Sequence, residues 1–279
     1  MADRETSAQP APEYGEVAGL RVGLEGTVLR LTLDRPEKKN AVSDTVNRAL
    51  TALLGQAQND ERVRAVLLDS SGPDFCAGAD IVARNSGGGP RPRPGAIQRR
   101  LPSLAHGLIP TLMELQLPVV CAVRGWAAGL GLHLALACDF AVVARDAVLW
   151  EPFLTRGFTP DSAGTWLLPR LVGPVRAREL VLLGERFNGE DAARWGLVHR
   201  AVDDKDVDGT AQDLARRLAR GPTVALGLAK KLLNDGLQEP LRRHLESEAF
   251  AMELSSRARD FGEGMAAFAE RRPPRFEGR

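Results

Sequence analysis

The segment from Arg124 to Gly164 contains residue types that can stabilise an anion and move a proton. Gly129 and Gly131 open an apolar, helix-like run; glycine lets the backbone approach a ligand, and the first N–H groups of a helix have no partner within it. Asp161 follows on a later turn, where its carboxylate can act as a general base. This arrangement predicts backbone donors facing a carboxylate, and we interpret the rest of the chain as their support.

A second glycine loop, Phe75 to Asp80 (FCAGAD), follows another apolar segment and can supply a second donor. Two N–H groups that converge on one carbonyl oxygen form an oxyanion hole, where losing one donor costs about 3–4 kcal/mol of transition-state stabilisation. A thioester carbonyl suits such a hole, because enolate formation places negative charge on its oxygen. Glycine loops are more often simple turns, so this pattern alone does not identify a site.

Composition excludes several classes of protein. The chain has 279 residues, 44% of them hydrophobic, and a net charge of +1, which argues against non-specific nucleic-acid binding and against a polybasic membrane surface. The sequence has no apolar run long enough to span a membrane, no signal-peptide pattern and no metal-ligand spacing. It also lacks the phosphate-binding and dinucleotide-binding glycine motifs. Three cysteines without CxxC spacing favour reduced thiols and a cytoplasmic location.

The order of elements predicts an α/β fold. Strand, glycine loop and helix follow one another repeatedly, and the strand patterns include Val28–Leu33, Val119–Val123 and Phe140–Ala144. After Ser162 the pattern is mostly helical, with residues 240–269 as one long segment. We expect a disordered tail at 1–15, a core that carries the site at 16–205, and a helical oligomerisation region at 206–279.

Four motifs, FCAGAD, RGWAAGLGLHLALACD, GFTPDSAGTWLLPRLVG and EGMAAFAERRPPRF, occur in this order. Together they resemble the crotonase (enoyl-CoA hydratase/isomerase) family, over nearly the whole chain from about Val17 to Phe276. The resemblance implies a spiral of ββα units, a helical C-terminal trimerisation region, and a homotrimer or homohexamer. It also implies an acyl-CoA thioester as substrate, with coenzyme A entering as part of that substrate and no separate cofactor or metal.

By this resemblance, the oxyanion donors are the N–H groups of Ala79 and Leu130, the latter in place of a commonly seen glycine. Asp161 matches an aspartate that shuttles protons in the isomerase branch acting on phenylacetate-derived ring-epoxide acyl-CoAs and in dienoyl-CoA isomerases. One carboxylate can remove a proton near the carbonyl and return it to another carbon. The alternative for Asp161 is an N-cap of the helix that follows it.

The chain departs from the family's hydratase pattern at two positions. Hydratases carry glutamates where this chain has His133 and Phe153, so hydration by the usual route is not expected. His133 can bond the thioester region, orient Asp161, transfer a proton, or simply line the pocket. Glu151 is expected on the same side of an extended segment as Phe153, so a catalytic role for it would require a local irregularity that turns it inward. His106, His199 and His244 are interpreted as surface or structural residues.

The resemblance also implies a coenzyme A site. Arg35 to Ala41 would lie near the nucleotide, with Arg35 and the lysines Lys38 and Lys39 available to phosphates; the alternative is a solvated basic loop. Ala77, Asp80 and Ile81 would flank the pantetheine and adenine, largely through backbone groups. One or two of four aromatic residues are expected in the acyl pocket: Trp126, Trp150, Phe153 and Trp166.

These observations favour an isomerase that shifts a double bond, or rearranges a ring, through an enolate. Two alternatives remain open. One is an enoyl-CoA hydratase in which His133 and Asp161 handle the water. The other is a catalytically silent acyl-CoA-binding paralogue, favoured by the two missing glutamates but not by the presence of Asp161 and both glycine loops.

Overall fold

The computed structural model describes residues 14–15, 17–81 and 93–279, and their strands form two sheets. The larger sheet has the order β1-β2-β3-β4-β6-β9 and the smaller one the order β5-β7-β8. The strands of the larger sheet are β1 (Leu20–Glu25), β2 (Val28–Leu33), β3 (Ala65–Ser70), β4 (Val119–Val123), β6 (Phe140–Ala144) and β9 (Arg200–Val202). Those of the smaller sheet are β5 (Trp126–Ala128), β7 (Val148–Trp150) and β8 (Arg186–Asn188).

From β4 to β7, consecutive strands alternate between the two sheets. β4 and β6 are parallel neighbours in the larger sheet, and the strands that follow them, β5 and β7, are parallel neighbours in the smaller one. Each such pair leads into a helix, α5 (Leu130–Ala137) or α6 (Gly164–Arg178). This repetition is the predicted ββα pattern. It brings the segments after β5 and β7 close together, because the two strands are hydrogen-bonded side by side.

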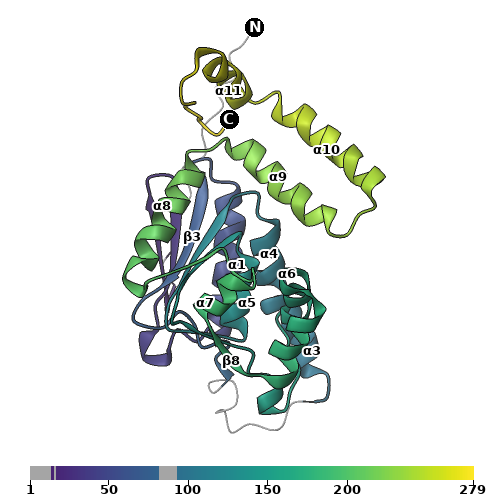
Figure 1. The fold of residues 1–279 in the computed structure, drawn as a ribbon. Coiled ribbons are helices and arrows are strands. Elements are labelled where there is room, and N and C mark those ends of the chain that lie inside the picture. The colour runs from purple at the N-terminus through teal and green to yellow at the C-terminus, as the bar shows by residue number, and fades with distance from the viewer. Residues whose placement is uncertain (1–13, 16, 82–92) are drawn as a thin grey trace.

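Helices cover both faces of the larger sheet (Figure 1). α8 (Val207–Ala219) packs against β3, β4 and β6, and its small buried residues Ala211, Ala215 and Ala219 allow a close approach. α1 (Asp44–Gln58) packs on α4 (Ala105–Glu114), which in turn contacts α5. Before the C-terminal part, the described residues also form the short α-helices α3 (Ala96–Arg100) and α7 (Gly189–Arg194). All eight residues of α5 are buried, as is all of β4, so these two elements form the centre of the core.

Three helices project from the core (Figure 1). They are α9 (Thr223–Gly236), α10 (Leu241–Ser255) and α11 (Arg259–Glu270), and we refer to them as the C-terminal arm. The expected single helix over 240–269 is wrong, because the helical segment breaks between Ser255 and Arg259. The predicted oligomerisation region begins at 206, yet α8 packs on the sheet. The part of the chain that projects from the core therefore begins after α8, at α9.

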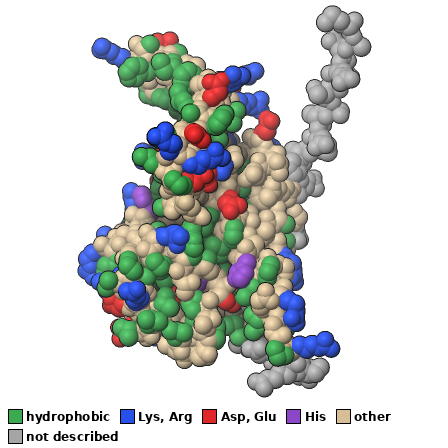
Figure 2. Space-filling view, turned by 90° about the vertical axis from the view of Figure 1, so that its right-hand side faces the viewer, with side chains coloured by type: hydrophobic (Ala, Val, Ile, Leu, Met, Phe, Trp, Pro, Cys, Tyr) green, Lys and Arg blue, Asp and Glu red, His purple; other side chains and the backbone are tan. Residues whose placement is uncertain are grey.

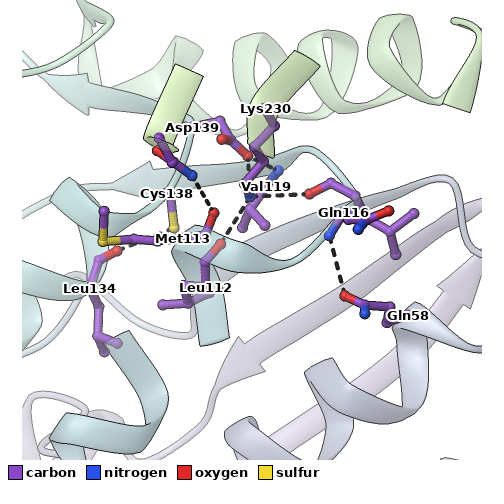
Figure 3. Close-up of polar contacts among 11 residues, drawn as sticks. Gln58, Leu112, Met113, Gln116, Val119, Leu134, Cys138, Asp139 and Lys230 are labelled. Carbon is purple, nitrogen blue, oxygen red and sulfur yellow. Dashed lines mark hydrogen bonds and ion pairs between the residues drawn. The ribbon is translucent and has the colours of Figure 1, made fainter. Parts of the chain in front are cut away.

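Lys230 is one of the side chains that join the C-terminal arm to the core. Lys230 of α9 donates to the Leu112 carbonyl at 2.9 Å and to the Leu117 carbonyl at 3.2 Å. Its Nζ also lies 2.8 Å from Oδ2 of Asp139, an oxygen that accepts the Val119 N–H as well (Figure 3). A cation with three oxygen partners can be buried at tolerable cost. The middle of α9 is thus fixed to the segments that follow α4 and α5 and, through Asp139, to the start of β4.

At the other end of the chain, most of the predicted tail 1–15 lies outside the described residues. Tyr14 is an exception, because its hydroxyl donates to Oδ2 of Asp60 at 2.9 Å. None of the described helices is long and apolar enough to cross a membrane.

Candidate active site

The two glycine loops lie against each other. Cys76 exchanges backbone hydrogen bonds with the neighbours of Ala127, and a Cβ at Gly131 would lie 2.3 Å from the Cys76 carbonyl oxygen. Gly78 has φ of 104°, and a Cβ there would lie 2.9 Å from the Ala128 carbonyl oxygen. Both positions therefore require glycine, which allows the start of α5 to touch the FCAGAD loop.

The predicted donors face this junction. The Gly78 carbonyl and the Asp80 N–H both bond Val42, so the Ala79 N–H between them points away from Val42. Leu130 is the first residue of α5, and the first N–H groups of a helix have no partner within it. Between described residues, neither N–H donates to a backbone oxygen. The structure thus brings the two loops together with both donors available.

The thiol beside these donors is not a nucleophile. Cys76 is fully buried, and burial raises the pKa of its thiol to about 12. A thiol with this pKa stays protonated at neutral pH, and the thiolate is the reactive form. The chemistry of the site must therefore come from other side chains.

His133 lies one turn into α5 and has a partner on each ring nitrogen. Its Nδ1 is 2.7 Å from Oγ of Ser162, and its Nε2 is 2.8 Å from Oε1 of Glu151. All three residues are at most 1% exposed. The Phe153 ring stacks on the imidazole with centroids 5.6 Å apart. Because both ring nitrogens have partners, His133 can orient Asp161 only indirectly, through Ser162, the residue next to it.

Glu151 and Ser162 are functional candidates that the sequence reasoning underrated or missed. Glu151 and Phe153 do share one side of their segment, as expected, since both contact His133. The available signal was a charged residue inside the otherwise apolar sequence VLWEPF. Ser162 had no comparable signal, because its partner is 29 residues away in the chain.

Asp161 is half-buried and lines a cavity of about 510 Å³ between α4, the start of α6 and the end of α9. Apolar side chains of this cavity include Ala105, Ile109, Met113 and Trp166. The Asp161 carbonyl oxygen lies 3.0 Å from Nε2 of His106, which is exposed at the surface, as expected. The cap alternative for Asp161 is wrong, because α6 begins at Gly164 and Ala163 is its N-cap, without a side-chain hydrogen bond.

The predicted coenzyme A residues cluster around one ion pair. Arg35 donates to the Ala41 carbonyl at 2.8 Å and to Oδ2 of Asp80 at 3.0 Å, and the exposed Lys38 lies 4.0 Å from the same oxygen. Ala77 donates its N–H to the Lys39 carbonyl at 2.9 Å, and Ile81 bonds back to Ala79. The structure brings these residues to the edge of the donor loops, while the guanidinium of Arg35 is partly engaged within the protein.

Only one of the four aromatic candidates lines the cavity, namely Trp166. Phe153 is buried on His133. Trp126 and Trp150 lie edge to face on the smaller sheet, with the Arg186 guanidinium 4.9 Å from each ring centroid.

Comparison with known proteins identifies the family of the chain. A family model described as enoyl-CoA hydratase/isomerase matches residues 23–279. The chain belongs to the enoyl-CoA hydratase/isomerase family. It is 40% identical to a 1,2-epoxyphenylacetyl-CoA isomerase of Escherichia coli (strain K12), over 92% of this chain and 97% of the relative. It is 39% identical to a probable enoyl-CoA hydratase of Rhodobacter capsulatus, over 89% and 94%.

Solved structures agree with this assignment. An enoyl-CoA hydratase from Bacillus anthracis superposes with a TM-score of 0.86 at 30% identity, covering 94% of this chain and all of the other. One from Polaromonas sp. JS666 gives a TM-score of 0.86 at 32% identity, covering 92% and 99%. The family, the crotonase fold and the enzyme class predicted from the sequence are confirmed.

Proposed function

We propose that the chain is an acyl-CoA isomerase that moves a double bond, or rearranges a ring, by proton transfer through an enolate. Asp161 is the acid and base, and the N–H groups of Ala79 and Leu130 hold the enolate oxygen. The name of the Escherichia coli relative, an isomerase of an epoxyphenylacetyl-CoA, agrees in reaction class.

One observation carries the choice of isomerase. The two positions where the family's hydratases hold a water between carboxylates contain His133 and Phe153, and their rings stack on each other. The nearby carboxylate of Glu151 is buried and bonded to His133. Of the two carboxylates Glu151 and Asp161, only Asp161 lines the cavity. Asp161 forms no ion pair with the described residues.

The chemistry needs no further group. The Asp161 carboxylate removes a proton from a carbon conjugated with the thioester, and electron density moves onto the carbonyl oxygen. Two backbone N–H groups stabilise that charge without reorganising. Asp161 then returns the proton to a different carbon of the chain or ring. Atoms balance because the product is an isomer of the substrate.

The rest of the proposal concerns binding and assembly. Arg35 and Lys38 contact the phosphates of coenzyme A, while Ala41, Ala77, Asp80 and Ile81 flank its pantetheine and adenine. The C-terminal arm forms a homotrimer or homohexamer. The cytoplasm is the proposed location, and the three buried free cysteines suit its reducing conditions.

Mass spectrometry of enoyl-CoA thioesters incubated in D₂O tests the function. Wild type should exchange a carbon-bound hydrogen for deuterium and shift the double bond, and Asp161→Asn should lose at least a hundredfold in rate, since acid–base catalysis contributes about 10²–10⁴-fold. Asp235→Asn is the matched control, because Asp235 lines the same cavity but pairs with Lys231. Gain of one water, unaffected by Asp161→Asn, would favour the hydratase. Binding without exchange would favour the silent paralogue.

A further inference from the structure

We propose that Glu151, His133 and Ser162 form a buried relay that positions the proposed base Asp161 over the oxyanion donors. This inference rests on the proposed function for its kinetic consequence, but the relay itself is a property of the fold. Glu151 and Ser162 are positioning residues, since neither lines the cavity.

The relay joins three segments that are distant in the sequence. Glu151 lies at the end of β7, His133 on α5 and Ser162 just before α6, and two hydrogen bonds of 2.8 and 2.7 Å connect them. Burial makes each bond important, because an unpaired polar group in such a place costs about 1–3 kcal/mol. The relay therefore holds the start of α6 against the start of α5, where Leu130 presents its N–H.

Glu151 also determines which ring nitrogen of His133 carries the hydrogen. An ionised carboxylate can only accept, so it selects the ring form with hydrogen on Nε2. In the neutral imidazole Nδ1 is then an acceptor, and Ser162 donates its hydroxyl hydrogen to it. A glutamine at position 151 could instead donate to Nε2, which would move the hydrogen to Nδ1 and reverse both bonds.

Two hydrogen bonds fix the backbone at Asp161. Its neighbour Ser162 is bonded to His133, and its own carbonyl oxygen accepts from His106 on α4. Ala163, on the other side of Ser162, has φ of 69°, which is unfavourable for a residue with a Cβ and persists only where neighbours enforce it. The relay supplies that enforcement. Because Asp161 must alternate between two carbons, a displacement of about 1 Å would cost about a hundredfold in rate.

A double-mutant cycle tests the relay. Glu151→Gln and Ser162→Ala should each lower kcat of the isomerase by about ten- to a hundredfold with little change in KM, because binding of the thioester is untouched. The double variant should be no worse than the more damaged single variant, since both changes break one unit. The control is Asp69→Asn, another buried carboxylate with one unpaired oxygen, which is on β3 and outside the relay. It should leave kcat within about threefold of wild type, and combine multiplicatively with Glu151→Gln.

A second measurement does not depend on turnover. Nitrogen-15 NMR of the imidazoles should show hydrogen on Nε2 of His133 in wild type and a changed ring state in Glu151→Gln; the chain has four histidines, and His133→Phe assigns the signal. An unchanged His133 spectrum would overturn the relay even if the protein proved not to be an isomerase. Failure of the isomerase assignment is thereby separated from failure of the relay.

Three kinetic results would also overturn the proposal. They are a Glu151→Gln enzyme with wild-type kcat, multiplicative effects of Glu151→Gln and Ser162→Ala, and release of free coenzyme A with an acyl group left on Ser162. The last would make Ser162 a nucleophile rather than a positioning residue. Should Glu151→Gln fail to fold, Ser162→Ala, which removes one oxygen atom, carries the test with the same expected loss of kcat.

Discussion

His133 is 0% exposed, which a polar ring tolerates only when both nitrogens are bonded. Glu151 and Ser162 meet this requirement, and Phe153 covers the ring face. The histidine therefore has a full set of partners of its own at a position where the family's hydratases carry a glutamate. This suits a site whose acid–base work is carried by a different residue.

Gly164 leaves no room beside that ring. A Cβ at Gly164 would lie 2.2 Å from Nε2 of His133. We expect Gly164→Ala to displace the imidazole, lower kcat at least tenfold and destabilise the fold by about 1–3 kcal/mol, the usual cost of overpacking. Steady-state kinetics and urea denaturation measure both effects. Gly209→Ala on α8, where a Cβ meets nothing within 4 Å, should be neutral or slightly stabilising; equal damage from both would contradict the steric argument.

The sequence was a better guide to which site residues lie close together than to the hydrogen bonds that they form. Asp161, Ala79, Leu130 and His133 come from motifs, and the structure brings their segments together. The partners of His133 are 18 and 29 residues away, and no local pattern specifies such pairs. The cap alternative for Asp161 was wrong because Ala163 adopts a left-handed conformation, which delays the start of α6. Backbone conformation of this kind is set by tertiary contacts.

Elements of the core were the most predictable part of the fold. Apolar runs such as Val119–Val123 are typical of parallel strands covered on both faces, and the structure reproduces these bounds. The break between α10 and α11 was not predicted, since neither Gly nor Pro marks residues 256–258. The position of the arm could not be predicted from local patterns either, because it depends on contacts between residues far apart in the chain, such as Lys230 with Asp139 and Asn234 with the Met113 carbonyl.

Replacing Lys230 should lower the free energy of unfolding more than replacing its neighbour Lys231. Lys230→Met leaves two carbonyls and the Asp139 carboxylate without their cation, so we expect a loss of about 1–3 kcal/mol of unfolding free energy. The loss stays below that of a fully buried pair, because the Asp139 side chain is 23% exposed. Lys231→Met removes an exposed i,i+4 pair with Asp235 and should cost less than about 0.5 kcal/mol. Urea denaturation at one protein concentration compares them, and equal losses would refute the anchoring role.

The lowered pKa of the Asp60 carboxyl predicts a pH effect on stability. Hydrogen bonds from Arg62 are the main cause that lowers the pKa of Asp60, to about 2 from 3.8. A carboxylate with a lowered pKa stabilises the fold above its unfolded value and loses this contribution as the pH falls toward about 2. Asp60→Asn should therefore be less stable than wild type by about 1–2 kcal/mol at pH 6. Melting curves should show the difference narrowing from pH 4 downward, and a constant difference would contradict this.

At the scale of the whole molecule, the C-terminal arm exposes a large part of its apolar surface. No residue of α10 is buried, and Phe250 and Phe268 are 78% and 83% exposed. Figure 2 shows hydrophobic side chains gathered with charged ones over the projecting upper part. Exposed apolar patches of this kind mark interaction surfaces, and the proposed trimer or hexamer would cover them.

Light scattering after size exclusion tests that assembly. Wild type should run as a trimer or hexamer, and Phe250→Glu with Phe268→Glu should dissociate it, weakening association at least tenfold because buried aromatic residues dominate such interfaces. Glu253→Gln, a change at an exposed carboxylate of the same helix, should leave the mass unchanged. A monomeric wild type at micromolar concentration would exclude the proposed oligomers.

Both proposed oxyanion donors belong to the main chain, which has a consequence for substitutions around them. If Ala79 and Leu130 contribute only their N–H groups, as proposed, changes of their side chains would preserve these donors, and a new reaction would require exchange of the side chains around them. The exchanges are not independent. A glutamate at position 133 would meet the buried carboxylate of Glu151, so a variant with glutamate at 133 requires an uncharged residue at 151. A library varied at 133, 151 and 153 should accordingly yield folded variants with glutamate at 133 only where position 151 is uncharged, and recovery of both glutamates together would disprove this dependence.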